Sequence, residues 1–387
     1  MVTIPFSEWQ FGGQCVALKS VRERNHVSRP PLPSATIIDV AAKAGVSKST
    51  AARALARYGS VSAKTREAVQ KAADELGYQP NALARSMITG RTKTIGVVIP
   101  DVGNHFFAVA MRGISTAARE AGYEVLLSST EGDLALERRA VELLAGKRVD
   151  GIVVAPVSTE ETGHLERLEG QGIAVTLLDR PASRVKAASF ISVNHVEAST
   201  LAVNHLIDLG HREIGIVSEA LMPEGWEPDA PQESRNLRPS AARLVGYVNA
   251  LRGAGLRFRD EYVARSAYAK AAAYEATRRL LTDNPQLTAV YCTDSELSAG
   301  AFAALQDLKI SCPKDMSLIG FDDQDWATLV RPRLTVVDQP SYQLGMAATE
   351  ELLSTIAADE DRRGDRMLSG RLIVRDSTAR PRSAGGR

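Results

Sequence analysis

The spacing of hydrophobic residues changes along the chain at about residue 95. Before that point, apolar side chains recur every three or four positions, which is typical of short amphipathic helices. Beyond it, short apolar runs that predict buried strands alternate with stretches of helical period. The predicted strands are 95–100, 123–129, 150–156, 174–179, 213–218, 289–292 and 316–323, and the predicted helices are 106–121, 136–144, 198–209, 241–254 and 271–281.

Strands that alternate with helices predict parallel sheets covered by helices on both faces, which is an α/β fold. The number of strand-helix units after residue 95 fits two such lobes better than one sheet. In doubly wound architectures, ligands bind outside the carboxyl ends of the strands. Several polar residues of this chain fall at those ends, so we expect a ligand cleft there.

Residues 36–56 contain a break that a single helix would not need. Helix formers surround a lone Gly45, and glycine inside a helix costs about 1 kcal/mol relative to alanine. Thr36 and Asp39 have the spacing of a capping box and predict a helix start. Gly45 is expected to end that helix, because glycine tolerates the left-handed backbone of a tight turn. Ser47 can then cap a second helix.

A third helix is predicted from about Ser62 to Leu76, closed by Gly77. Two short helices joined by a tight turn and braced by a third form a helix-turn-helix unit. Asn81 suits the N-cap of a further short helix over 81–87, which is too short to be stable alone. A polar linker follows it.

Charge is distributed unevenly, although the whole chain carries only +1. Between residues 34 and 94 there are ten basic and four acidic residues, so the remainder of the chain is acidic. A small basic unit on an acidic body indicates that the small unit meets a polyanion.

Other sequence features narrow the class of protein. The three cysteines, Cys15, Cys292 and Cys312, have no metal-type spacing, so we expect a reducing cytoplasm and no metal site. We find no secretory signal, and no apolar run reaches the ~18 residues of a membrane span. Residues 1–33 show no period and are interpreted as a flexible extension.

Two rival functions are weighed against DNA binding. An enzyme on the same lobes is disfavoured because the chain lacks GxSxG, GxxxxGK[ST] and HExxH, and lacks GxGxxG after the first strand, so no cofactor is expected. An extracellular sugar-binding module is disfavoured by the missing signal peptide and the basic N-terminal unit.

Ordered motifs along nearly the whole chain resemble the LacI/GalR family of bacterial transcription regulators. They include TIIDVAAKAGVSKSTAARAL, NHFFA, VDGIVVAP, LLDRP, HLIDLGHREIGIV, RLVGYVNAL and LIGFDDQDWATLVRPRLTVVDQP. The resemblance implies a homodimeric, cytoplasmic repressor, possibly a tetramer, that binds a palindromic operator. It also implies a two-lobed body like that of type I periplasmic sugar-binding proteins. The implied segments are a flexible 1–33, a DNA-binding domain 34–80, a hinge helix and linker 81–94, an effector-binding and dimerisation domain 95–380 and a flexible tail 381–387.

The resemblance also implies which residues meet DNA. The second helix of a helix-turn-helix lies in the major groove, where Arg53 could fork onto a guanine or touch only phosphate. The hinge helix is expected to pair with its dimer mate in the minor groove, with Met87 as the inserted wedge or, alternatively, a plain core methionine. The expected DNA contacts are Ser47, Lys48, Ser49, Thr50, Arg53, Lys64, Thr65, Asn81, Ala84 and Met87.

An effector pocket is implied at the strand ends, formed by Asn104, Phe107, Asp179, Arg243, Asp294, Asp322 and Gln339. Carboxylates, an arginine and an amide suit a polyhydroxylated neutral ligand, because each can pair with vicinal hydroxyls. A sugar or sugar derivative is therefore expected, with a purine or nucleoside corepressor as the alternative and a sugar-processing enzyme as a weaker one. Asp179 could instead be structural, and Phe106 could belong to the core.

The chain departs from the family pattern at two histidines. His105 stands where the family often has proline, and Asn194-His195 where it often has aspartate-asparagine. Each histidine could bind ligand, although a lone loop histidine is more often a polar filler. Segment 219–240 is longer than usual, and its four prolines predict an irregular loop that overhangs the cleft or forms a surface insertion.

Overall fold

The computed structural model describes residues 35–56, 59–78, 90–219, 237–358 and 364–382. It divides into two compact units, Met1–Arg85 and Ser86–Arg387. The predicted hinge helix, the flexible extension and most of the 219–240 segment lie outside the described residues.

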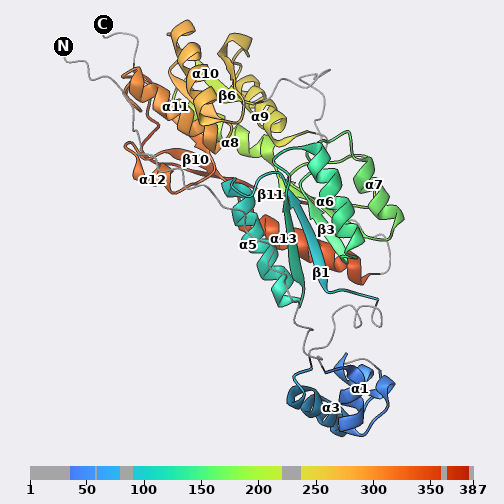
Figure 1. Cartoon of the computed structure of the whole chain (residues 1–387). Helices are drawn as coiled ribbons and strands as arrows, with labels where there is room; N and C mark the ends of the chain where they lie inside the picture. Colours follow the sequence, from blue (N-terminus) through green and yellow to red (C-terminus); the bar gives the residue numbers. More distant parts are fainter. Residues whose placement is uncertain (1–34, 57–58, 79–89, 220–236, 359–363, 383–387) are drawn as a thin grey trace, which may run out of the picture. The chain divides into compact units, whose positions relative to one another are not determined.

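The N-terminal unit contains three helices, α1 (Ile37–Ala44), α2 (Lys48–Leu55) and α3 (Ala63–Glu75) (Figure 1). They bury one small core, to which α2 and α3 contribute residues three or four positions apart, and α1 contributes the adjacent Val40 and Ala41. The buried core residues are Val40, Ala41, Ala51, Ala54, Val69, Ala72 and Ala73.

Local capping explains why these helices are short. Thr36 and Asp39 form the predicted capping box, in which the Thr36 hydroxyl accepts from the Asp39 backbone and the Asp39 carboxylate accepts from the Thr36 backbone. Gly45 ends α1 in the left-handed region with φ 65°, and Ser47 accepts a hydrogen bond from the backbone N–H of Thr50 to start α2. The helix-turn-helix prediction is confirmed.

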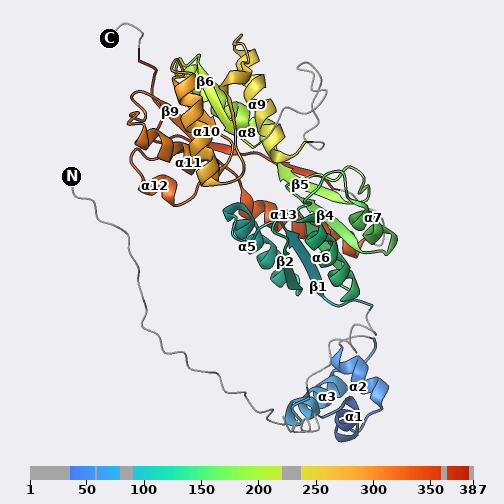
Figure 2. The same ribbon diagram turned by 45° about the horizontal axis from the view of Figure 1, so that its top comes forward.

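The second unit is built from two six-stranded sheets (Figures 1 and 2). The first sheet has the order β11-β5-β4-β3-β1-β2, with all neighbours parallel. The second has the corresponding order β12-β10-β9-β8-β6-β7, in which only β12 is antiparallel to its neighbour. The strands of the first lobe are β1 (Thr94–Ile99), β2 (Glu124–Ser129), β3 (Gly151–Val154), β4 (Ala174–Leu178), β5 (Ser189–Val193) and β11 (Arg366–Leu368). Those of the second lobe are β6 (Ile214–Ser218), β7 (Val263–Arg265), β8 (Ala289–Cys292), β9 (Ser317–Phe321), β10 (Thr335–Asp338) and β12 (Arg371–Ile373).

Helices cover these sheets. The first lobe is packed by α5 (His105–Glu120), α6 (Leu134–Gly146), α7 (Gly163–Gly170) and α13 (Ser341–Ala357). The second is packed by α8 (His195–Asp208), α9 (Pro239–Gly253), α10 (Lys270–Asp283) and α11 (Ser295–Asp307), with the short α12 (Trp326–Leu329) and a 3-10 turn (Asp260–Tyr262). The predicted two-lobed, doubly wound α/β architecture is confirmed.

The chain passes between the lobes three times. It leaves the first lobe between β5 and α8, returns between β10 and α13, and crosses again between β11 and β12. His195 and Gln339 lie at the first two crossings. Side chains there are held by both lobes at once, which makes these crossings the natural position for a ligand-responsive site.

Helices α5 and α13 lie side by side in both ribbon views and pack closely (Figures 1 and 2). Two glycines allow this approach, Gly113 on α5 and Gly345 on α13. A Cβ atom on Gly345 would lie 2.0 Å from the carbonyl oxygen of Ala110, and one on Gly113 would lie 2.1 Å from that of Tyr342. Only glycine fits at either position.

Three sequence expectations are corrected. The strand predicted over 123–129 forms but is not buried: β2 is an edge strand, and Leu126 and Leu127 are 38% and 43% exposed. The final residues of the 219–240 segment are regular, because Pro239 occupies the first turn of α9, where its missing N–H costs no hydrogen bond. Five strands and the helices α7, α11 and α13 were not predicted as elements, because the strands are short and α11 and α13 are buried on much of their surface.

No helix within the described ranges has the length and apolar character needed to cross a membrane. The same residues contain no cluster of histidine, cysteine, aspartate and glutamate that could hold a metal ion.

Candidate functional site

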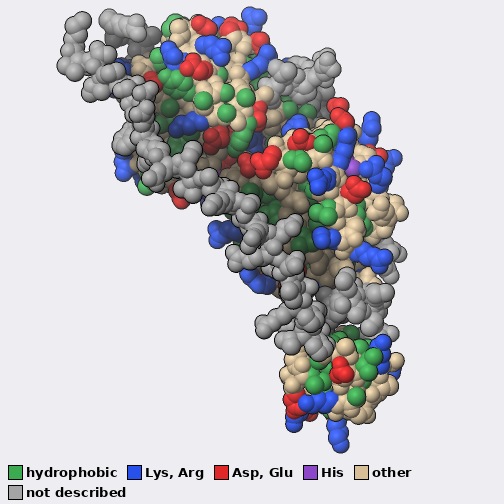
Figure 3. Space-filling view, viewed as in Figure 1, with side chains coloured by type: hydrophobic (Ala, Val, Ile, Leu, Met, Phe, Trp, Pro, Cys, Tyr) green, Lys and Arg blue, Asp and Glu red, His purple; other side chains and the backbone are tan. Residues whose placement is uncertain are grey.

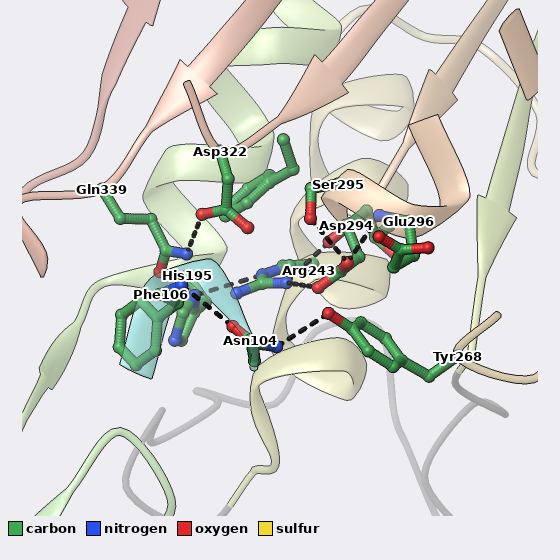
Figure 4. A network of polar contacts seen from close by, with 12 residues as sticks. Asn104, Phe106, His195, Arg243, Tyr268, Asp294, Ser295, Glu296, Asp322 and Gln339 are labelled. Carbon is green, nitrogen blue, oxygen red and sulfur yellow. Dashed lines mark hydrogen bonds and ion pairs between the residues drawn. The ribbon is translucent and has the colours of Figure 1, made fainter. Parts of the chain in front are cut away.

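A cavity of about 560 Å³ lies between the two lobes, at the carboxyl ends of their strands. All seven residues expected to form an effector pocket line it: Asn104, Phe107, Asp179, Arg243, Asp294, Asp322 and Gln339. Figure 4 shows most of them converging from both lobes. The further lining residues include Phe106, Glu131, Arg180, Glu219, Arg238, Ser240 and Tyr268.

A chain of buried hydrogen bonds connects the lobes at the floor of this cavity. Asp179, which follows β4 in the first lobe, pairs through Oδ1 with Nε2 of His195 at 3.1 Å. The Nε of Arg243, on α9 in the second lobe, donates to Nδ1 of the same imidazole at 3.3 Å. His195 is therefore not a lone polar filler but the central member of an Asp-His-Arg link.

The geometry of this link requires a neutral imidazole. Nδ1 accepts from Arg243, so the ring proton lies on Nε2 and is donated to Asp179. Burial and the positive charge of Arg243 lower the pKa of His195, and Asp179 opposes them without reversing the direction. Burial alone would raise the pKa of Asp179, but the hydrogen bond from His195 and the positive charges of Arg243 and Arg180 bring it below its usual value.

The Arg243 guanidinium is fixed by several further contacts. Its Nη1 donates to the carbonyl oxygen of Thr293 at 2.6 Å and lies 3.8 Å from Oδ2 of Asp294. Its guanidinium carbon stacks over the ring of Phe321, 3.9 Å from the ring centroid. With only 7% of the residue exposed, this cation presents a fixed set of donors to the cavity.

Asp294 and Asp322 form an acidic pair beside Arg243. Asp294 follows β8 and accepts the backbone N–H of Glu296 at 3.1 Å, and Asp322 follows β9 and accepts from Gln339 at 2.5 Å. Burial and the neighbouring Asp322 raise the pKa of Asp294 to about 7, and burial also raises the pKa of Asp322. Near neutral pH the Asp294 carboxyl can therefore act as a hydrogen-bond donor or an acceptor.

Two of these aspartates occupy equivalent positions in the two lobes. Asp179 after β4 and Asp322 after β9 both have left-handed backbones, with φ 63° and 66°. Each donates its N–H to a neighbouring strand, to Ile191 and Val337 respectively, at 2.8 Å. Aspartate tolerates this conformation better than most residues, and such strain is commonly stored at functional sites.

The two lobes also meet directly across the cavity. Asn104 caps α5 by accepting the N–H of Phe106 at 2.9 Å, and its Nδ2 donates to the Tyr268 hydroxyl, from the loop after β7, at 2.7 Å. Phe106 and Phe107 contact each other edge to face, belong to the core and line the cavity at the same time. Phe106 therefore belongs to the core, as considered from the sequence, and also lines the cavity.

Sequence reasoning missed Tyr268, Arg180 and Arg238, and did not predict the role of His195. Tyr268 follows a three-residue strand that is too short to be recognised from its pattern. Arg180 directly follows the predicted Asp179, so its position at a strand end was an available signal. The partners of His195 are distant in sequence, so no local pattern could indicate them.

In the N-terminal unit, the expected DNA-contacting residues divide into two groups. Lys48, Ser49, Arg53 and Lys64 are exposed on α2 and at the start of α3, and Figure 3 shows Lys and Arg side chains on the outer surface of this unit. The hydroxyls of Ser47, Thr50 and Thr65 are instead engaged in capping pairs, Ser47 with Thr50 at 2.9 Å and Ser62 with Thr65 at 2.8 Å. The expected contacts Asn81, Ala84 and Met87 lie outside the described residues.

Comparison with known proteins identifies the chain. A model described as "Bacterial regulatory proteins, lacI family" matches residues 36–81, and one described as "Periplasmic binding protein-like domain" matches 203–378. Catabolite control protein A of Priestia megaterium is 34% identical over 313 residues, which are 81% of this chain and 90% of that protein. The chain belongs to the lacI family of bacterial regulatory proteins.

Other members of the lacI family match as fully. The HTH-type transcriptional repressor CytR of Escherichia coli (strain K12) is 32% identical over 89% of this chain and 96% of its own length. A transcriptional regulator CelR–cellobiose complex is 25% identical, covers 89% of this chain and 99% of that one, and superposes with a TM-score of 0.65. The lac repressor dimer bound to operator and the anti-inducer ONPF, at 24% identity over 89% of this chain and 99% of that one, shares the fold with a TM-score of 0.75. CytR is named as a transcriptional repressor and CelR as a transcriptional regulator, and neither is named as an enzyme.

Proposed function

We propose that this lacI-family member is a cytoplasmic, homodimeric repressor whose affinity for a palindromic operator is controlled by a sugar or sugar derivative in the interlobe cavity. The helix-turn-helix supports the DNA half of this proposal. Lys48, Ser49 and Arg53 lie exposed along one helix, where base edges of a major groove can be reached. Ser47, Thr50, Lys64 and Thr65, near helix starts, are suited to hold the phosphate backbone.

One observation carries the ligand half. Gln339 is 6% exposed and lines the cavity, and its Oε1 has no hydrogen-bond partner among the described residues, while its Nε2 is bound to Asp322. A buried carbonyl oxygen without a donor is unfavourable by about 1–3 kcal/mol. A ligand hydroxyl would supply that donor, and the nearby Asp179, Asp294 and Asp322 offer further acceptors for hydroxyls.

The link between ligand and DNA is proposed to run through the hinge. Asn81, Ala84 and Met87 belong to a short segment that is too weakly helical to be stable alone, so it requires a dimer mate and a minor groove for support. A ligand that moves one lobe relative to the other in each subunit of the dimer would change how well the paired hinge segments are supported. The exposed apolar edge of β2, with Leu126 and Leu127, is consistent with pairing of two bodies.

The test uses the full-length chain. Operator fragments selected from a randomised DNA pool are titrated with the protein over a range of salt concentrations, with and without a panel of sugars. A steep fall of affinity with salt is expected from phosphate contacts. At least one sugar is expected both to change operator affinity and to raise thermal stability, by about 2.7 kcal/mol at a hundred times its dissociation constant.

Two variants separate the halves of the proposal. Lys48→Ala should abolish selective DNA binding and leave the stabilisation by sugar intact. Gln339→Leu should abolish the stabilisation by sugar and leave selective DNA binding intact. A chain that selects no sequence from the pool would refute the repressor function. Sugar stabilisation that survives unchanged in Gln339→Leu would show that the ligand binds elsewhere.

A further inference from the structure

Two guanidinium groups in the interlobe cavity have no carboxylate partner among the residues that the structure describes. Arg180 comes from the first lobe, directly after Asp179, and Arg238 comes from the second lobe, directly before α9. Both line the cavity, and both are more exposed than Arg243 at its floor. Within the described part of the chain, neither forms an ion pair.

The two groups are brought together by one loop. Nη1 of Arg238 donates to the carbonyl oxygen of Val157 at 2.9 Å, and Nη1 of Arg180 donates to that of Pro156 at 3.4 Å. Pro156 and Val157 are adjacent, so two like charges from opposite lobes converge on consecutive carbonyls. Each guanidinium has five N–H donors, and these bonds use only one of them.

The two arginines act on each other electrostatically. Burial lowers the pKa of Arg180, and the charge of Arg238 lowers it further, by more than any nearby carboxylate raises it. Glu219 also lines the cavity and acts in the opposite direction, but it lies outside ion-pair distance of both arginines. Two cations that repel each other and have spare donors are suited to bind a shared anion.

The start of α9 adds a partial positive charge beside Arg238. Arg238 is the N-cap residue and makes no side-chain cap, Pro239 follows it, and Ser240 lines the cavity. The first N–H groups of a helix carry a partial positive charge and favour an anion. The cavity thus combines these two arginines and the start of α9 with a floor whose carboxylates and amide accept hydroxyl donors, and Asp101, Glu131 and Glu219 also line it.

We propose that the effector is an acidic sugar derivative, whose phosphate or carboxylate group is held between Arg180 and Arg238 while its hydroxyls meet Asp179, Asp322 and Gln339. This inference rests on the proposed sugar-responsive function and narrows the ligand class. Because Arg180 and Arg238 belong to different lobes, the anion would also join the lobes at their outer edge. A neutral sugar could bridge the two arginines only through hydroxyl oxygens, without the charge assistance that an anion provides.

The experiment compares matched ligands on the full-length chain. Neutral sugars (ribose, glucose, galactose) are each tested beside their phosphate esters and their sugar acids by isothermal titration calorimetry and thermal shift. At least one acidic compound is expected to bind about tenfold more tightly than its neutral parent, the difference that a charge-assisted pair of hydrogen bonds provides. Comparison of the phosphate esters with the sugar acids shows whether the site prefers a phosphate or a carboxylate group.

Variants decide whether the arginines cause the difference. Arg238→Gln, at an exposed position, should reduce the advantage of the acidic ligand over its neutral parent to below about threefold, and Arg180→Gln should act alike. Arg279→Gln on the outer face of α10 is the matched control. If neutral parents bind as well as their acids, or if the advantage survives both variants, the anion site is wrong while the sugar-responsive function stands. Failure of every compound to bind would contradict both.

Discussion

Replacing Gly345 with alanine should damage the first lobe far more than one methyl group suggests. Gly345 lies where α13 crosses α5, and the new Cβ would be 2.0 Å from the carbonyl oxygen of Ala110 and 2.8 Å from its carbonyl carbon. Ordinary contact begins at 3.4 Å, so the two helices must separate by more than about 1 Å. The clash is with backbone, so no side-chain rotation can relieve it.

The magnitude follows from what the two helices bury. Leu344, Ala348 and Leu352 of α13 are completely buried against the sheet, and a gap of this size forfeits a quarter to a half of each contact along the crossing. Overpacking usually costs 1–3 kcal/mol, and a backbone clash belongs at the upper end. We therefore expect Gly345→Ala to lower the free energy of unfolding by about 3 kcal/mol.

The same substitution at Gly146 is the control. Gly146 ends α6 with no atom within 4 Å of its Cβ position, so alanine there should stabilise the helix by about 0.5 kcal/mol. Urea unfolding of both variants and wild type, followed by far-UV circular dichroism, gives the shift in midpoint at a constant slope. A Gly345→Ala midpoint within error of wild type would refute the close-packing argument. The two substitutions should shift the urea midpoint in opposite directions.

Four further predictions concern the two functional regions. Arg243→Leu leaves buried partners uncompensated and should cost about 3–5 kcal/mol of stability in urea unfolding; a neutral outcome would show that the Asp-His-Arg link contributes nothing. The pKa of His195 is lowered, so below about pH 6.5 the unfolded chain binds a proton that the folded chain does not bind. The free energy of unfolding should therefore fall as the pH drops below about 6.5, and His195→Gln should reduce this dependence on pH. The pKa of Asp294 is raised from 3.8 to about 7, so the stability it contributes is present below pH 3.8 and is lost progressively as the pH rises to about 7. Asp294→Asn should remove that loss from a pH series. Arg53→Ala should weaken operator binding and relax selectivity at one base pair by about 1–3 kcal/mol, checked by competition with single-base operator variants.

The N-terminal unit could be predicted from its sequence because the residues that start and end its helices are local. Thr36 and Asp39 are three residues apart, and so are Ser47 and Thr50, so the caps that start α1 and α2 can be recognised from spacing alone. Gly45 ends α1 by its own backbone preference. Strand-helix alternation likewise indicated the doubly wound lobes, because each buried strand needs its own apolar run.

The exposure of β2 and the hydrogen-bond network of the cavity depend on the tertiary fold. The apolar run of β2 resembles that of a central strand, and only the strand order places it at an edge. Resemblance indicated the seven pocket residues, but not that His195 would join Asp179 to Arg243, nor that Arg180 and Arg238 would converge on one loop. Those partners come from separate strand ends and opposite lobes. Their contacts exist only after the chain has crossed between the lobes, so no pattern of neighbouring residues can encode them.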